Sequence, residues 1–268
     1  MTASPTVLRD VVFSTIPGFR PVTLDLYLPL GGHATVILFV HGGGWRLGSR
    51  RAFGPNFTTE SSFDRIVAAG FAVASVDYRL SGEATFPAQV DDVRSAMEWI
   101  AEHGAEHGLD SSRMIVWGES AGATLGALVA LEDPAKVPGV SVLGVIDWYG
   151  PADLVAFAEA ADPATLAASR ESEWLGGTAL DLPDAARMAS PAYQVRPDAP
   201  PFLIAHGLAD QFVPHSQSER FADALRVNGV EVEFTSVPGA NHMWNGVADT
   251  APLLDQALEF ARRVTEGS

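Results

Sequence analysis

The strongest signal in the chain is the stretch Met114-Ile115-Val116-Trp117-Gly118-Glu119-Ser120-Ala121-Gly122. Its apolar first half predicts a buried strand, and the small residues that follow, Ala121 to Leu131, predict a helix. Ser120 is therefore predicted to lie at a sharp turn from strand to helix, which makes its hydroxyl a candidate nucleophile. Gly118 and Gly122 leave room for a strained turn and for close packing of helix on strand.

A second glycine-rich segment, His41-Gly42-Gly43-Gly44-Trp45, lies upstream and follows another apolar stretch, Thr35 to Val40. Glycines allow the backbone to turn its N–H groups toward a substrate oxygen without obstruction by side chains. We expect an oxyanion hole formed by the N–H groups of Gly43, Gly44 and Ala121. His41 is expected to organise the loop rather than to act as a base.

A serine hydroxyl is a poor nucleophile at neutral pH, so acyl transfer needs a base and a carboxylate that orients the base. Asp210 follows the predicted strand Phe202 to Ala205, and His242 follows the last predicted strand. The order Ser, Asp, His along the chain is that of α/β-hydrolases. The sequence therefore predicts Ser120 as nucleophile, His242 as base and Asp210 as the orienting acid.

Other candidates are weaker. Asp147, on the predicted strand Val142 to Trp148, is an alternative acid. His206 and His215 lack the chain position of a base that follows the acid, and we expect them at the surface. Further charged residues are also expected to be solvated, on a helix face and beside the glycine loop: Asp91, Asp92 and Arg94, and Arg46, Arg50 and Arg51.

The remaining patterns predict an α/β fold. Val22 to Leu28 alternates as an antiparallel strand does, and Val7 to Phe13 could be its hairpin partner. Buried parallel strands are predicted at Thr35 to Val40, Phe71 to Val76, Met114 to Trp117, Val142 to Trp148, Phe202 to Ala205 and Glu231 to Val237. Helices are predicted at Ser61 to Ala69, Ala88 to His103, Ala121 to Leu131, His215 to Asn228 and Leu253 to Val264. Together they indicate a doubly wound, mostly parallel eight-stranded sheet with an antiparallel N-terminal hairpin.

From Pro151 to about Pro197 this alternation stops, and alanine-rich stretches predict two or three short helices. We interpret this segment as a short helical lid inserted in the fold. No repeat, low-complexity tract or flexible linker divides the chain, so residues 1–268 are predicted to form a single domain.

Composition limits the partners. The net charge of −16 disfavours binding to nucleic acid or to anionic membranes. The absence of cysteine excludes disulfides and thiolate metal sites, and no H-E-x-x-H helix occurs, so we expect no metal ion or cofactor. No secretory pattern is found in Met1 to Asp10 and no apolar run of membrane-spanning length occurs, which indicates a cytoplasmic protein.

The motifs resemble the hormone-sensitive-lipase-like branch of the α/β-hydrolases. Val76-Asp77-Tyr78-Arg79-Leu80, together with Phe86-Pro87-Ala88-Gln89 and Asp92, is similar to that family's tyrosine–arginine segment. Two features depart from the family: Ser81-Gly82-Glu83 stands where Ala-Pro-Glu is common, and strand-like sequence from Val7 leaves no N-terminal helical cap. The chain thus looks like the cap-poor esterases similar to feruloyl and acetyl-xylan esterases.

This resemblance implies a serine carboxylic-ester hydrolase that acts through an acyl-enzyme on a small-molecule ester. Because no cap covers the site, we expect a shallow acyl pocket and short-chain acyl groups. Two other functions remain open: amide hydrolysis of the kynurenine formamidase type, and a non-catalytic ligand-binding receptor on the same fold. The natural substrate and the oligomeric state do not follow from these motifs.

Overall fold

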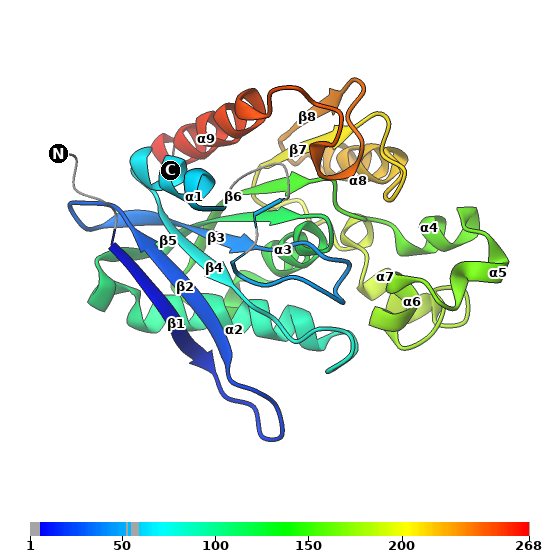
Figure 1. Ribbon diagram of the computed structural model, residues 1–268, viewed down its shortest axis with the longest axis horizontal. Coiled ribbons are helices and arrows are strands. Elements are labelled where there is room, and N and C mark those ends of the chain that lie inside the picture. Colours follow the sequence, from blue (N-terminus) through cyan, green and yellow to red (C-terminus); the bar gives the residue numbers. More distant parts are fainter. Residues whose placement is uncertain (1–5, 52, 55–58, 268) are drawn as a thin grey trace.

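The computed structural model describes residues 6–51, 53–54 and 59–267, so the first five residues of the segment searched for a secretory pattern lie outside this range. An eight-stranded sheet in the order β1-β2-β4-β3-β5-β6-β7-β8 forms its centre (Figure 1). The strands are β1 Thr6–Ser14, β2 Val22–Leu28, β3 Ala34–Val40, β4 Ala72–Val76, β5 Leu109–Glu119, β6 Ser141–Trp148, β7 Phe202–Gly207 and β8 Val232–Val237. The predicted fold class, an eight-stranded α/β-hydrolase sheet, is confirmed.

The sheet is antiparallel only at its N-terminal edge. β1 pairs antiparallel with β2, and β2 with β4, whereas every later pair is parallel. The carboxyl ends of β3 and β5 to β8 therefore meet at one edge of the sheet. Val40 pairs with Gly118 at the ends of β3 and β5, which brings the glycine-rich loop and the Ser120 turn together. Open α/β sheets bind ligands at such a point, where the strand order reverses.

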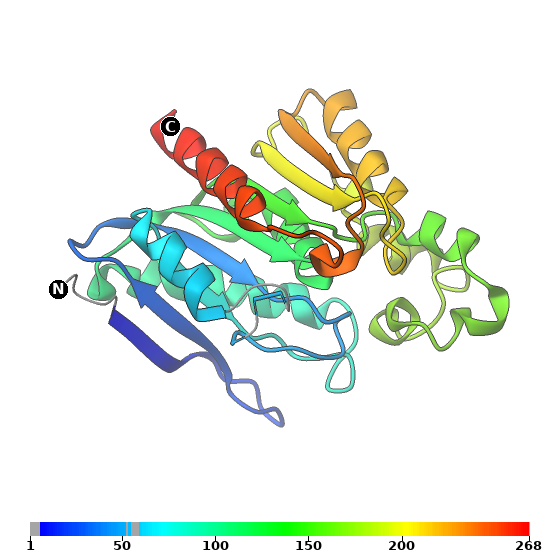
Figure 2. The ribbon, with the colours of Figure 1, turned by 45° about the horizontal axis from the view of Figure 1, so that its top comes forward.

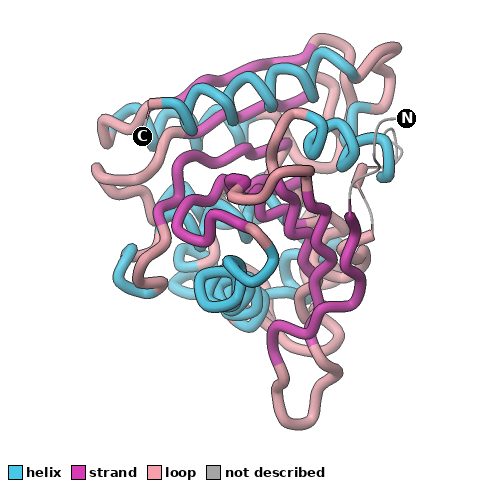
Figure 3. The backbone as a smooth tube through the Cα atoms, turned by 90° about the vertical axis from the view of Figure 1, so that its left-hand side faces the viewer, coloured by secondary structure: helices cyan, strands magenta, loops and turns pink. Residues whose placement is uncertain are grey.

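Helices cover both faces of the sheet (Figure 2). One face packs α2 Ala88–His103, α3 Ala121–Leu131 and α8 Ser216–Val227, and the other packs α1 Thr59–Ala68 and α9 Ala251–Glu266. Alternate residues of β3 supply the two cores: Leu38 packs on the first side and Phe39 on the second. The end-on view in Figure 3 shows the strands between these helical layers. Short 3₁₀ turns lie at Gly104–His107, Pro134–Lys136, Pro191–Tyr193 and His242–Trp244.

The segment from residue 151 to 197 holds four short helices, more than the two or three expected. They are α4 Leu154–Ala160, α5 Pro163–Leu166, α6 Arg170–Leu175 and α7 Pro183–Met188, and they lie together at one end of the molecule (Figure 1). Each spans only one or two turns, too few for a periodic pattern. Helices α4, α5 and α6 each begin with an N-cap residue. The side chain of that residue, Asp153, Asp162 or Ser169, accepts a hydrogen bond from a backbone N–H of the first turn. The single-domain organisation and the role of this segment as a lid stay predictions.

Two of the charged residues expected in solvent are buried in ion pairs. Arg50 is only 8% exposed and donates to the carboxylates of Asp25 and Asp77. Asp92 is 1% exposed and binds the Arg79 guanidinium at 2.8 Å. The prediction that Arg50 and Asp92 are solvated is therefore wrong. A guanidinium can be buried in this way because its planar fork matches a carboxylate.

No helix in the described part of the chain is both long and apolar enough to cross a membrane. The cytoplasmic location stays a prediction.

Candidate active site

Ser120 lies at a strained turn between β5 and α3. Its backbone φ of 51° and ψ of −122° fall outside the regions that residues with a side chain usually adopt. Glycine is required on both sides of this turn. A Cβ added at Gly118 would lie 2.4 Å from the Gly122 carbonyl oxygen, and one at Gly122 would lie 2.2 Å from the Val40 carbonyl oxygen. The turn thus presents the serine side chain at the carboxyl edge of the sheet.

A hydrogen-bonded chain joins the three predicted catalytic side chains. His242 Nε2 lies 3.0 Å from Ser120 Oγ, and His242 Nδ1 lies 2.6 Å from Asp210 Oδ2. Because a carboxylate can only accept, Nδ1 carries the proton and Nε2 is free to accept the serine proton. The structure therefore brings together Ser120, His242 and Asp210, which are far apart in the sequence, in the arrangement of a nucleophile, a base and an orienting acid.

The loops that carry the acid and the base are tied to each other. Asn241 Oδ1 accepts hydrogen bonds from the backbone N–H of Gln211 at 3.0 Å and of His242 at 2.7 Å. Trp244 is fully buried next to Trp148, with ring centroids 5.4 Å apart. These contacts hold the imidazole ring in place over the end of β5.

Asp210 is itself fixed by several donors. Its Oδ1 accepts from the N–H groups of Phe212 and Val213 at 2.8 and 2.9 Å, and its Oδ2 accepts from both His242 and His206. Burial alone would raise the pKa of Asp210, but these hydrogen bonds outweigh it and hold the pKa below its usual range. The Asp210 carboxyl is therefore ionised at neutral pH, where it can stabilise a positive charge on the His242 imidazole.

His206 was predicted to lie at the surface, and this is wrong. It is fully buried on β7, accepts from the Ser218 hydroxyl at Nδ1, 2.7 Å away, and donates from Nε2 to Asp210 at 3.2 Å. His206 thus helps to position the acid rather than replacing the base. His215 lies nearby, and its Nε2 is 2.8 Å from the Ser236 hydroxyl. Neither histidine contacts Ser120.

The glycine loop lies against the Ser120 turn. Gly43 and Gly44 have φ values of 121° and 60°, which favour glycine. Neither N–H donates to a backbone carbonyl of any described residue. Ala121 is the first residue of α3, so its N–H has no acceptor within the helix. These three amides remain the candidate oxyanion donors.

His41 organises this loop, as expected. It is 1% exposed, its Nδ1 lies 2.7 Å from the Gly42 carbonyl oxygen, and its ring stacks on Tyr78 at 4.3 Å. Burial lowers the pKa of His41 and keeps the ring neutral. Further along the loop, Trp45 stacks on Trp174 of α6 at 4.1 Å, so the same loop anchors the 151–197 segment.

The alternative acid, Asp147, is not in contact with His242. It is 2% exposed, and its Oδ1 accepts from the N–H of Gly150 at 2.9 Å. Burial raises the pKa of Asp147 to about 6. A carboxyl group so placed supports the turn after β6.

Glu119 is a residue of the site that sequence reasoning missed. It is 4% exposed beneath the serine turn, where it accepts from the N–H of Gly54 at 3.0 Å and from the Tyr149 hydroxyl at 3.2 Å. Burial raises its pKa to about 7. Its place directly after the apolar run Met114 to Trp117 and Gly118 was the available signal.

Two cavities, of about 360 and 580 Å³, meet at Ser120 and His242. The smaller is lined by the 151–197 segment, through residues such as Phe157, and the larger by Phe53 and Tyr149. Volumes of this size suit small-molecule ligands. Cavities of this size do not support the expected shallow acyl pocket. The preference for short acyl groups stays a prediction.

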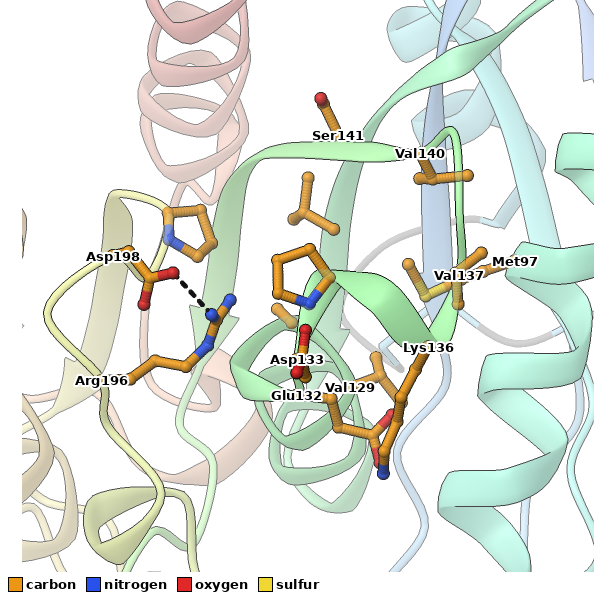
Figure 4. A pocket seen from close by; sticks show the side chains of 14 residues that line it. Met97, Val129, Glu132, Asp133, Lys136, Val137, Val140, Ser141, Arg196 and Asp198 are labelled. Atoms are coloured by element: carbon orange, nitrogen blue, oxygen red, sulfur yellow. Dashed lines mark hydrogen bonds and ion pairs between the residues drawn. The ribbon is translucent and has the colours of Figure 1, made fainter.

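A third cavity, of about 210 Å³, lies near the start of β6, away from the serine (Figure 4). Both of its basic side chains are already paired, since Lys136 binds Glu132 and Arg196 binds Asp198, each at 2.8 Å. It is lined by no histidine and is a weaker candidate. Among the described residues, no group of three His, Cys, Asp or Glu side chains is placed to hold a metal ion.

The sheet and the serine at its strand-to-helix turn define an α/β-hydrolase. Comparison with known proteins narrows the class, because the model of the BD-FAE family matches residues 24–225. The chain belongs to this family, within the hormone-sensitive-lipase-like carboxylesterase branch of the α/β-hydrolases.

Individual relatives agree with this assignment. Esterase LipI of Mycobacterium tuberculosis is 32% identical over 85% of this chain and 71% of its own length. Esterase LipQ of the same organism is also 32% identical, over 85% of this chain. The chain spans only 56%, 55% and 53% of the lengths of the mycobacterial relatives LipQ, LipM and LipC. A truncated carbohydrate esterase from gut microbiota has a similar structure, with a TM-score of 0.84, 28% identity and coverage of 97% and 96% of the two chains.

Proposed function

We propose that the protein is a serine carboxylic-ester hydrolase. The observation that carries the proposal is the hydrogen-bonded chain from Ser120 through His242 to Asp210 at the edge of the sheet. The relatives support it, since those named above are esterases.

In the first half of the reaction Ser120 Oγ attacks the ester carbonyl while His242 Nε2 takes the hydroxyl proton. Asp210 stabilises the imidazolium that forms. The C–O bond to the alcohol then breaks, and His242 returns the proton to the leaving oxygen, which leaves an acyl group on Ser120. In the second half His242 Nε2 takes a proton from water as the water oxygen attacks the acyl carbonyl. The bond between the acyl carbon and Ser120 Oγ then breaks, His242 returns the proton to Ser120 Oγ, and the acid leaves.

We assign the stabilisation of the negative oxygen in each tetrahedral intermediate to the backbone N–H groups of Gly43, Gly44 and Ala121, which would donate hydrogen bonds to it. Their N–H groups need an acceptor at the site, and pre-oriented donors of this kind stabilise charge that develops in the transition state. The ester is the partner in this proposal, and no metal ion takes part in any step.

The test is the hydrolysis of p-nitrophenyl acetate by the wild-type protein and by Ser120→Ala. The substitution removes one hydroxyl oxygen at the turn and few packing contacts, so the thermal midpoint should stay nearly unchanged. In contrast, kcat should fall by several orders of magnitude, because the nucleophile is lost. A folded Ser120→Ala protein with activity within about tenfold of wild type would refute the proposal.

A further inference from the structure

Arg170 is the side chain that links the two cavities at the serine. Both cavities are lined by Ser120 and His242, and the other two side chains that line both are Arg170 and Phe212. Arg170 begins α6 in the 151–197 segment, and Phe212 lies in the loop that carries Asp210. The Arg170 side chain therefore lines both cavities from which an ester could meet Ser120.

The Arg170 side chain is supported from two directions. Its guanidinium lies over the ring of Phe212, with the central carbon 5.9 Å from the ring centroid. Its methylene groups pack against the glycine loop, since a Cβ added at Gly44 would lie 2.3 Å from Arg170 Cδ. The side chain is exposed, yet these contacts hold it beside the candidate oxyanion donors.

Among the residues that the structure describes, no carboxylate forms an ion pair with Arg170. The chain has 17 basic residues, and 14 of them form ion pairs with described carboxylates. Arg113 instead donates to the Thr265 carbonyl. Within the described residues, this leaves Arg170 and Arg262, for which neither an ion pair nor such a hydrogen bond is found. Arg262 lies on α9, which is not part of either cavity. With a net charge of −16, a free guanidinium beside the nucleophile is unusual.

The other charged groups of the two cavities leave Arg170 available. Arg46 pairs with Glu173, and Arg51 is bound to Asp10 at 2.7 Å. Glu171 lines the smaller cavity and would repel an anion there. Glu119 lines the larger cavity, but its carboxyl is held by Gly54 and Tyr149.

We propose that Arg170 binds the carboxylate of an anionic ester, and that the substrates of this protein are esters that carry a carboxylate group. The inference rests on the proposed ester hydrolysis. A guanidinium presents several N–H donors in a planar fork that matches a carboxylate, and such charge-assisted hydrogen bonds are about twice as strong as neutral ones. Arg170 acts here as a specificity residue, since it takes no part in bond making or breaking.

The test compares Arg170→Gln with wild type on two matched pairs of esters. In the first pair, 4-carboxyphenyl acetate carries its carboxylate on the alcohol part, and phenyl acetate is its neutral partner. In the second pair, phenyl hydrogen adipate carries its carboxylate on the acyl part, and phenyl hexanoate is its neutral partner. We expect kcat/KM for the charged member of at least one pair to fall about tenfold more than for its neutral partner, mainly through KM. Arg170→Lys should recover part of this loss, and higher salt should weaken the preference of the wild type.

Arg262→Gln is the matched control, because it removes the other arginine without an ion pair at a site outside both cavities and should leave both pairs unchanged. Equal losses for the charged and neutral members of both pairs would overturn the inference while leaving ester hydrolysis intact. A wild-type protein that hydrolyses none of the four esters would refute the proposed function itself.

Discussion

Replacing Glu119 with glutamine is expected to change how the stability of the protein depends on pH. The carboxyl group is buried, with Gly54 N–H and the Tyr149 hydroxyl as its hydrogen-bond partners. Burial raises its pKa from the usual 4.5 to about 7. Glutamine has nearly the same shape as the protonated acid but does not titrate.

The sign follows from proton binding. Below pH 4.5 the carboxyl is protonated in both the folded and the unfolded chain, so ionisation costs nothing. Between pH 4.5 and 7 the unfolded chain loses this proton while the folded protein keeps it, and stability falls as pH rises. At about 1.4 kcal/mol per pH unit, the shift corresponds to about 3 kcal/mol of stability lost by the time the pH exceeds 7.

The assay is urea unfolding of wild type and Glu119→Gln from pH 4.5 to 8. The free energy of unfolding of the wild type should fall by about 3 kcal/mol relative to the variant across this range, because all other titrating groups are common to both proteins. Glu98→Gln, which changes an exposed carboxylate of α2, controls for the loss of charge. A wild-type minus Glu119→Gln difference that does not change with pH would refute the reasoning.

Three further outcomes are expected. Asp210→Asn should lower kcat by about 10⁴-fold near neutral pH with little change in KM, because the amide no longer selects the Nδ1–H tautomer of His242; a loss below about tenfold in steady-state assays would contradict this. Gly122→Ala should lower the thermal midpoint through a clash with the Val40 carbonyl that costs about 1–3 kcal/mol or more, whereas Gly82→Ala, which meets open space, should not. Short acyl groups should be preferred, and kcat/KM that rises from p-nitrophenyl butyrate to decanoate would show the opposite.

The parts of the fold and site that depend on local pattern could be predicted from sequence. Continuous apolar runs predicted the parallel strands, and helix α2 was predicted to the residue, Ala88–His103. The glycine loop and the serine turn follow neighbouring strands β3 and β5, and their loops meet because the carboxyl ends of parallel strands share an edge. The predicted ends of the strands therefore gave the position of the site in the fold, although the contacts between its side chains could not be predicted.

Burial of charge could not be predicted in the same way, because it depends on partners that the fold supplies. Arg50 finds Asp25 across 25 positions of sequence, and Glu119 finds Tyr149 across 30. His206 is buried because the Asp210 turn closes over the end of β7. The number of short helices in the 151–197 segment was underestimated for another reason. A helix of one or two turns is too short to show the periodic pattern of apolar residues from which helices are predicted.

The most direct test of the central claim is to identify the residue that reacts with a fluorophosphonate probe. The probe bonds to a serine that a neighbouring base activates. The account predicts one adduct, located on Ser120 by peptide mass spectrometry, that is absent in Ser120→Ala and forms much more slowly in His242→Gln. Ser169 also lines the smaller cavity, and Ser169→Ala should keep the adduct. An adduct on any serine other than Ser120, or undiminished labelling of Ser120→Ala, would contradict the assignment of Ser120 as the nucleophile.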